Sequence, residues 1–249
     1  MAITGSFAPT SPGRQRDILS VVPDQPDHAI RCLKRAGHNS VWLIHRPRQQ
    51  LRTLKRWPIS PFLLLKLAMG IAQPQRLIRG ERRLARAGIR TASPVDGWSF
   101  RWRGWPPVVE VELVYVPGRS GLEWARVASV DDRLRRRHGV AIGRVVAELA
   151  GAGLFHRDLK LSNLIFGAAD GEDLWLIDTV GIRRMRRRDE EIARMLERVA
   201  VQALGYGLPL ARASWMPALL NALRPQPPQT RRAVLRRLKS RTLDELLAE

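Results

Sequence analysis

Cysteine is almost absent from this sequence. Its 249 residues include a single cysteine, Cys32, so no disulfide can form within the chain. No Cys-x-x-Cys pair and no histidine pair at ligand spacing is present, which leaves a structural zinc site without ligands. The sequence therefore excludes the disulfide-rich secreted class and the zinc-finger class, and it favours a reducing cytoplasm.

Long apolar runs are also lacking. No apolar segment of the secretory type follows Met1, and the richest run, residues 62–72, is interrupted by Lys66 and too short to span a bilayer. We expect this run to form a helix packed on the fold, with an apolar element facing a substrate or a membrane as the alternative. The protein is predicted to be cytoplasmic, and a peripheral place on the inner face of the cytoplasmic membrane is left open.

Acidic residues are scarce beside basic ones. There are 23 Asp and Glu against 43 Lys and Arg, a formal net charge of +20. A field of this sign favours an anionic partner such as a nucleotide, a phosphorylated sugar or a phospholipid surface. Nucleic acid is disfavoured, because the tryptophans are not interleaved with basic residues as a stacking platform needs. The 45% of hydrophobic residues suffices for one domain of two lobes.

The chemistry that is present is concentrated in residues 153–182. Two short apolar runs, 164–166 and 174–177, flank a polar turn with the Asp-Gly dipeptide that is typical of a β-hairpin. Asp158 and Asn163 precede the first strand and Asp178 follows the second, so the hairpin brings these side chains together. Clustered oxygen ligands suit Mg²⁺, and phosphoryl transfer needs such an ion.

The order of these residues resembles a known pattern. The catalytic and metal-binding loops of the protein-kinase superfamily are similar to this stretch, which has His156-Arg157-Asp158, then Asn163, an apolar strand and Asp178. Within this superfamily, the chain resembles the small bacterial lipopolysaccharide kinases, the Kdo/heptose (WaaP-like) and RIO-like group. The resemblance implies an α+β fold of two lobes, a small lobe with an antiparallel sheet and a mostly helical large lobe, with ATP and Mg²⁺ bound between them.

The resemblance also implies roles for single residues. Asp158 would be the catalytic base that orients the acceptor hydroxyl, and Lys160 would lie near the γ-phosphate. Asn163 and Asp178 would be the metal ligands, with Asp178 bridging the metal to the β- and γ-phosphates. Asp178 is followed by Thr-Val-Gly in place of Phe-Gly, so a phenylalanine-driven switch is not expected.

The phosphate-covering loop of the small lobe is matched only in part. Strands are expected at 41–44 and 51–55, and residues 35–40 before them stand where a kinase has its glycine-rich loop. Gly37 alone is present there, which leaves backbone amides near Ser40 to cover the phosphates.

Two charged residues of the small lobe are predicted to act together. Lys55 ends the second strand, where kinases have the lysine that contacts the α- and β-phosphates. Glu81 lies on or beside the buried face of a helix expected at 75–88, where an unpaired carboxylate is costly. We therefore predict that Glu81 pairs with Lys55. A strand from residue 108 then leads to Tyr115 and Val116, whose backbone groups would bind the adenine as a kinase hinge does.

The rest of the chain is predicted to be mostly helical, at 131–152, at 189–204 and in the basic stretch 231–249. The last helix is expected to pack on the large lobe or to lie on an anionic membrane. The arginine-rich run 183–188 either binds an anion or is a solvated face. The expected divisions are a flexible tail 1–27, a small lobe 28–114, a large lobe 115–224, and a Pro-rich link with a basic helix 225–249.

The sequence therefore predicts an ATP- and Mg²⁺-dependent kinase that transfers the γ-phosphate to an alcohol group. A lipopolysaccharide-core sugar is the favoured acceptor, since the chain is small and basic and carries the altered motif at Asp178. A serine/threonine protein kinase is the alternative, because His-Arg-Asp-Leu-Lys fits that group better. A pseudokinase or a basic module that binds a membrane or nucleic acid is the alternative from another class. We expect a monomer with an anionic acceptor, a glycolipid sugar or a protein hydroxyl.

Overall fold

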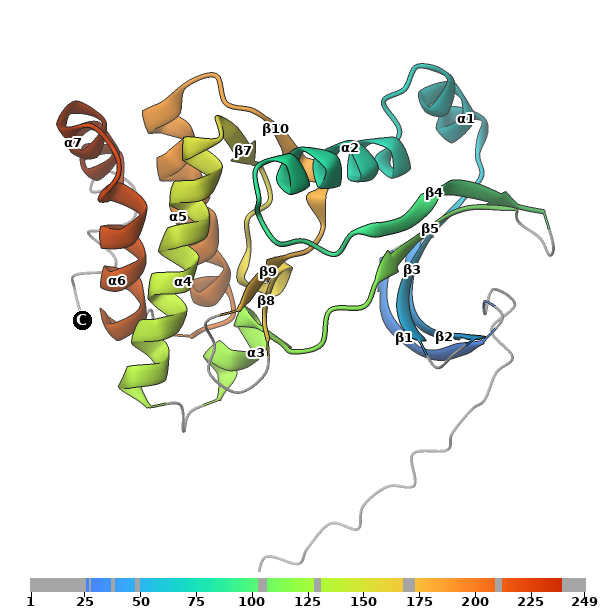
Figure 1. Ribbon diagram of the computed structural model, residues 1–249, viewed down its shortest axis with the longest axis horizontal. Helices are drawn as coiled ribbons and strands as arrows, with labels where there is room; N and C mark the ends of the chain where they lie inside the picture. The colour runs from blue at the N-terminus through green and yellow to red at the C-terminus, as the bar shows by residue number, and fades with distance from the viewer. Residues whose placement is uncertain are drawn as a thin grey trace, which may run out of the picture.

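The computed structural model describes residues 26, 28–36, 39–47, 50–102, 107–127, 131–167, 173–208 and 212–238. Figure 1 shows a curved sheet with helices α1 and α2 beside it, next to a mostly helical part. We call these parts the small and the large lobe. The expected tail up to residue 25, Gly37 and the Asp170-Gly171 turn lie outside the described residues.

The small lobe is built on an antiparallel sheet of five strands in the order β1-β2-β3-β5-β4. The strands are β1 (Ala29–Ala36), β2 (Asn39–Arg46), β3 (Gln50–Pro58), β4 (Pro94–Arg101) and β5 (Val108–Val114). Lys55 of β3 stands opposite Val41 on one side and Val111 on the other. The sheet therefore holds Lys55 in its central strand.

Alternation along β3 gives neighbouring residues opposite faces of the sheet. Trp57, on the same face as Lys55, packs against Leu77 and Ile78 of α2. Arg56 points to the other face, where it is buried and donates to Glu110 at 3.0 Å.

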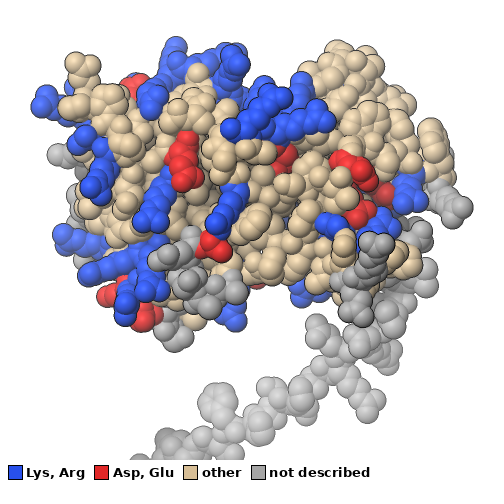
Figure 2. Space-filling model, viewed as in Figure 1, with Lys and Arg blue, Asp and Glu red and all other residues tan. Residues whose placement is uncertain are grey.

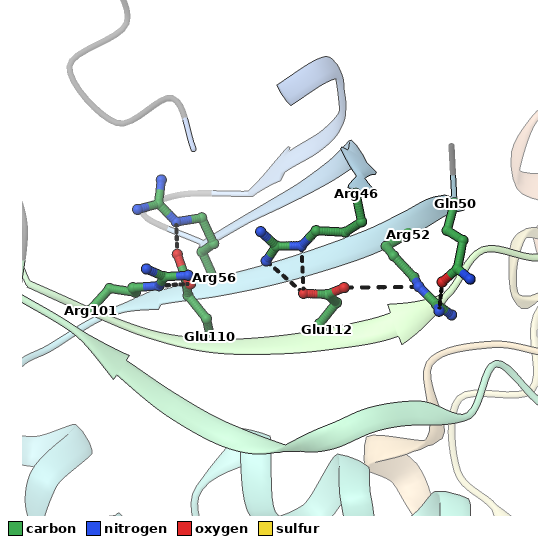
Figure 3. A network of polar contacts seen from close by, with 7 residues as sticks. All are labelled: Arg46, Gln50, Arg52, Arg56, Arg101, Glu110 and Glu112. Atoms are coloured by element: carbon green, nitrogen blue, oxygen red, sulfur yellow. Dashed lines mark hydrogen bonds and ion pairs between the residues drawn. The ribbon is translucent and has the colours of Figure 1, made fainter. Parts of the chain in front are cut away.

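Figure 3 shows the polar network on this second face of the sheet. The buried Glu110 also accepts a bond from Arg101 at 3.1 Å, and Glu112 accepts one from Arg46 at 2.7 Å. Each carboxylate of β5 thus lies among guanidinium groups from neighbouring strands. A slip by one residue would place these charges against apolar side chains, so the network fixes the register that points Lys55 the other way.

Two helices cover the inner face of the sheet: α1 (Pro61–Ala68) and α2 (Gln73–Arg86). Ser60 caps α1 by accepting a bond from the Leu63 amide at 3.1 Å. Leu67 anchors α1 against Val109 of the sheet, as the prediction of a packed helix requires. The helix predicted at 75–88 is confirmed as α2, with its apolar side buried.

The large lobe contains α3 (Gly121–Arg126), α4 (Asp132–Gly151), α5 (Arg188–Gly205), α6 (Arg212–Leu223) and α7 (Pro228–Leu238). Helices α4 and α6 lie in close contact (Figure 1). A Cβ on Gly139 would lie 2.1 Å from the Ser214 carbonyl, and one on Gly143 would lie 2.4 Å from that of Ala218. Glycine at these positions therefore permits the helix contact on which the core of the lobe is built.

Short strands complete the large lobe: β6 (Arg119–Ser120), β7 (Leu154–His156), β8 (Leu164–Phe166), β9 (Leu174–Leu176) and β10 (Ile182–Arg184). The predicted hairpin is confirmed as the antiparallel pair β8–β9, and β10 pairs with β7. These pairings place the loop after β7 beside the turn after β9. Within the described residues, no helix is long and apolar enough to cross a membrane.

Candidate active site

A cavity of ≈ 420 Å³ lies between the sheet and the large lobe. Its walls come from strands β1, β2 and β3, from the segment after β5, and from β8 and the residues that follow β9. The lining residues include Ser40, Lys55, Tyr115, Val116, Asn163 and Asp178. Residues predicted as phosphate-binding, adenine-binding and metal-binding thus share one cavity, although they are widely separated in the sequence.

Lys55 and Asp178 meet across this cavity. The Lys55 ammonium donates to Oδ1 of Asp178 at 3.2 Å, and the Lys55 side chain is only 14% exposed. Burial acts to raise the pKa of Asp178, but the charge and hydrogen bond of Lys55 outweigh it and hold that pKa below its usual value. Asp178 is therefore an anion at neutral pH.

Asp178 also has an uncommon backbone conformation. Its φ of 63° and ψ of 63° lie in the left-handed region, which aspartate tolerates better than most residues. Left-handed backbone at a non-glycine residue is costly and concentrates at functional sites. Here it turns the chain from β9 into the short 3₁₀ turn Thr179–Gly181 and leaves the carboxylate facing Lys55.

Asp158 and Asn163 lie on the loop between β7 and β8. The Asn163 amide nitrogen donates to the Asp158 carbonyl at 2.9 Å, which leaves the amide oxygen of Asn163 as an acceptor. Oδ2 of Asp158 accepts from Arg157 at 2.9 and 3.0 Å. A Cβ on Gly181 would stand 3.2 Å from the same oxygen, so the turn after Asp178 lies directly against Asp158.

His156 holds the start of this loop. It is fully buried, and burial is the main reason that its pKa is lowered to about 4, so it is neutral at physiological pH. Nδ1 accepts the Asp158 amide at 3.2 Å, which assigns the remaining proton to Nε2. His156 therefore positions Asp158 as a neutral hydrogen-bond acceptor.

The direct ion pair predicted between Lys55 and Glu81 is not formed in the structure. Lys55 contacts Asp178, while Oε1 of Glu81 lies 2.9 Å from the Thr179 hydroxyl. Oε2 is buried with no hydrogen-bond partner among the described residues. The prediction failed because the Thr179 hydroxyl takes the place of Lys55 beside the Glu81 carboxyl group. The kinase motif has no residue that corresponds to Thr179, so the sequence did not indicate this contact.

Glu81 is poised between its two protonation states. Burial is the main cause that raises its pKa to about 7, against the opposing effects of nearby Thr91 and Thr179 hydroxyls and the Lys55 charge. The Thr91 hydroxyl gives its proton to the Leu176 carbonyl at 2.9 Å. The Thr179 hydroxyl also lies 3.0 Å from the Leu77 carbonyl, which can only accept. The Thr179 hydroxyl has one proton and cannot donate fully to both the Leu77 carbonyl and Glu81. If Glu81 is protonated, it donates to Thr179 while Thr179 donates to Leu77, so both hydrogen bonds are formed.

Helix α2 is fastened to the turn after Asp178 by contacts that the sequence did not reveal. Arg76 donates to the Val180 carbonyl and Arg83 to the Ile182 carbonyl, each at 3.1 Å. A Cβ on Gly80 would lie 2.1 Å from the Thr179 carbonyl oxygen, so no larger residue fits there. The helix and the Asp178 turn therefore form one packed unit.

Other predicted residues have simpler surroundings. The buried Ser40 accepts a bond from the Trp42 indole at 2.9 Å. Lys160 is half-buried, immediately before the 3₁₀ turn Leu161–Asn163, and makes no ion pair among the described residues. Gln202 of α5 was missed: its amide bonds both the backbone and the hydroxyl of Ser162, at 2.9 and 3.0 Å. Only the fold brings Gln202 to this loop, so no local pattern could have found it.

A second hollow of ≈ 400 Å³ includes Arg157 in its lining. It is lined by Phe155, Arg157, Arg183, Arg194, Glu197 and Arg198. Arg183 stacks over the Phe155 ring at 4.4 Å and pairs with Glu191 at 2.5 Å. We call this hollow the arginine basin; it adjoins Asp158 through Arg157.

Comparison with known proteins was made by sequence and by structure. No family model matches the chain, and no curated protein matches it in sequence. A solved structure described as WaaP in complex with acyl carrier protein superposes with a TM-score of 0.60 at 17% identity, over 88% of this chain and 84% of that one. The fold is therefore protein-kinase-like, α+β with an antiparallel sheet in the first part and helices in the second, which confirms the fold predicted from the sequence.

Proposed function

We propose that this protein is an ATP- and Mg²⁺-dependent phosphotransferase that transfers the γ-phosphate to a hydroxyl group of an anionic acceptor. The observation that carries the proposal is the meeting of Lys55 and Asp178 at 3.2 Å in the cavity that Asn163 also lines. A kinase-like fold alone allows this function, whereas a partly buried lysine that faces an ionised aspartate supplies the charges that phosphate and metal binding require.

The residues fit a magnesium ion by their donor chemistry. Asp178 offers an ionised carboxylate, and Asn163 offers the amide oxygen that its hydrogen bond to Asp158 leaves as an acceptor. Hard oxygen donors in this small number suit Mg²⁺, which takes its other ligands from phosphate and water. The ion would neutralise the charge on the transferring phosphate.

The remaining roles follow from position. Lys55 would neutralise the α- and β-phosphates, and the backbone of Tyr115 and Val116 would meet the adenine at the far wall of the cavity. Asp158 would accept the hydrogen bond of the attacking hydroxyl, because its carboxylate is bonded to Arg157, which lines the arginine basin. Lys160 is placed one residue before the Leu161–Asn163 turn and would supply positive charge near the γ-phosphate.

The arginine basin supports an anionic acceptor. An acceptor bound there would present its hydroxyl to Asp158 while its own phosphate or carboxylate groups meet Arg183 or Arg198. A lipopolysaccharide-core sugar satisfies this requirement, since it carries hydroxyl and anionic groups near one another. A protein hydroxyl in an acidic segment is the second candidate acceptor.

A non-catalytic, nucleotide-binding role is the second candidate function, because Lys55 contacts Asp178 in place of Glu81. The test is transfer of label from ATP by the purified chain, with Mg²⁺ and either a cell-envelope glycolipid fraction or an acidic protein as acceptor. Labelled glycolipid, lost in Asp178→Asn, is the expected result. Labelled protein alone would favour a protein kinase, and ATP binding without transfer to either acceptor would favour the non-catalytic role.

A further inference from the structure

Helix α1 exposes apolar side chains that the rest of the fold does not cover. Phe62 is 64% exposed, Leu65 is 55% exposed and Met69, at the end of the helix, is 54% exposed. Leu67, on the opposite side, is buried against the sheet and anchors the helix. The exposed side is therefore an outward, apolar surface on a firmly attached helix, and large side chains of this kind mark a contact with a partner.

The neighbouring helix α2 adds positive charge without negative charge. Arg79, Arg82 and Arg86 are exposed at helical spacing, and Arg79 also reaches the carbonyl of Gly70 in the turn that joins the two helices. Between residues 59 and 90 the only acidic residue is Glu81, which is 3% exposed. Figure 2 shows the result, with a dense basic cluster over α2 next to the largely uncharged end formed by α1.

Charge and shape together identify the partner. A second copy of the chain would bring two basic surfaces together, which their repulsion opposes. The apolar side chains project outward rather than line a groove, and Lys66 stacks over the Phe62 ring at 3.9 Å with its charge at the edge of the apolar surface. Apolar side chains that project beside unopposed arginines suit the interface of an anionic bilayer, where the first enter the headgroup boundary and the second meet phosphates.

We propose that the exposed sides of α1 and α2 form a docking surface for an anionic lipid membrane, through Phe62, Leu65, Met69, Arg82 and Arg86. The inference goes beyond the proposed function and does not depend on phosphoryl transfer. The other predicted membrane contact, the basic stretch 231–249, is described only as far as residue 238, and residues 239–249 lie outside the described part of the chain. The apolar residues Val234 and Leu238 of α7 are buried, so that side of α7 packs on the large lobe.

The first test is cosedimentation of the full chain with vesicles. Phosphatidylcholine vesicles containing phosphatidylglycerol should bind the protein and pure phosphatidylcholine should not, and binding should weaken as salt rises from about 50 to about 500 mM. The double variant Arg82→Gln/Arg86→Gln should lose about 10- to 30-fold in affinity. The matched variant Arg232→Gln/Arg236→Gln, which changes exposed arginines of α7, should stay within about twofold of wild type.

A second measurement places the contact directly. In a Cys32→Ser background, a polarity-sensitive dye on Met69→Cys should shift to the blue and brighten with anionic vesicles. The same dye on Leu220→Cys, an equally exposed site on α6, should not change. Phe62→Ser/Leu65→Ser should lower vesicle affinity at least about tenfold with an unchanged melting temperature, because both side chains are exposed.

Several outcomes would overturn the proposal. They are absence of binding to anionic vesicles at low salt, equal binding to neutral vesicles, an equal loss in the α7 variant, and a silent dye at residue 69. In the first case the surface serves a protein partner. None of these outcomes decides whether the protein transfers phosphate, because transfer is followed by label from ATP and can be measured with the acidic protein as acceptor, without lipid.

Discussion

Lys55 and Asp178 are 123 residues apart in the sequence, and their side chains meet at 3.2 Å. The central strand β3 presents the lysine, and the left-handed turn after β9 presents the aspartate. Each charge lowers the cost of burying the other, so the pair holds the two lobes in register at the cavity. A bound nucleotide and its metal would offer both residues a new partner of opposite charge. The contact is therefore the place where the fold and the proposed chemistry can be tested together.

Asp178→Asn removes the charge at this contact and should lower phosphoryl transfer on the order of 100- to 1000-fold. The isosteric amide keeps the shape of the turn, so the free energy of unfolding should fall by about 1 kcal/mol, the cost of leaving Lys55 without its anion. Transfer of label from ATP and thermal unfolding measure the two effects. Asp173→Asn is the matched control, because its exposed pair with Arg90 lies away from the cavity. Near-wild-type turnover of Asp178→Asn would show that the site is wrongly assigned.

Asp158→Ala should remove turnover and leave nucleotide affinity nearly unchanged, because Asp158 does not line the cavity and its carboxylate is bonded to Arg157 rather than to Lys55. Titration of the protein with ATP and Mg²⁺ separates binding from transfer. Asp158→Asn serves as the companion variant, since it keeps an oxygen for Arg157 but has no carboxylate to take the proton of the attacking hydroxyl. If both variants turn over normally, Asp158 has no part in the reaction.

Gly80→Ala should separate α2 from the turn after Asp178. The new Cβ would lie 2.1 Å from the Thr179 carbonyl oxygen, so the helix must move, at a cost of about 1–3 kcal/mol in the free energy of unfolding and with loss of activity. Gly151→Ala is the control, because nothing lies within 4 Å of its Cβ. It should be neutral or more stable by up to about 1 kcal/mol. Similar unfolding curves for Gly80→Ala and wild type would contradict the close packing.

Much of this arrangement could be predicted from the sequence because it is local. Apolar runs on both sides of an Asp-Gly turn specify the β8–β9 hairpin, and the hairpin brings Asn163, just before β8, close to Asp178, just after β9. The helix α2 was likewise found from its apolar spacing. In each case the residues that form the element are contiguous in the sequence, so the local pattern is enough to predict it.

The rest depends on contacts between distant segments. Thr179 contacts Glu81, and Asp178 contacts Lys55. The sequence could not show these contacts, because they form only when α2 packs on the turn after Asp178, which Gly80 permits. Helix α6 was not predicted; it contains Pro217, and a proline inside a helix removes a backbone hydrogen bond. The exposure of α1 was left open as an alternative, because the composition of residues 62–72 fits a buried helix as well as an outward one.

The last prediction uses the protonation of Glu81. Its pKa is raised to about 7 in the folded chain, mainly by burial, against an ordinary value of 4.5. Between these values the folded chain binds more protons at this site than the unfolded chain, so stability from Glu81 is present below about pH 4.5 and is lost as the pH rises through about 7. Glu81→Gln cannot ionise and should remove this loss.

The free energy of unfolding should therefore favour Glu81→Gln over wild type more strongly at pH 8 than at pH 5, by about 2–3 kcal/mol. Urea unfolding at the two pH values measures it, and the difference between variants cancels the opposite pH trend of the buried His138 and His156, whose pKa values are lowered by burial. Glu123→Gln is the control, since its pKa is lowered by bonds from Ser120 and its contribution has the opposite sign. A pH-independent difference between Glu81→Gln and wild type would mean that Glu81 is already ionised, held by Lys55 as the sequence predicted. Glu81 would then form an ion pair with Lys55 in most molecules, and the contact between Lys55 and Asp178 would be the less populated arrangement in solution.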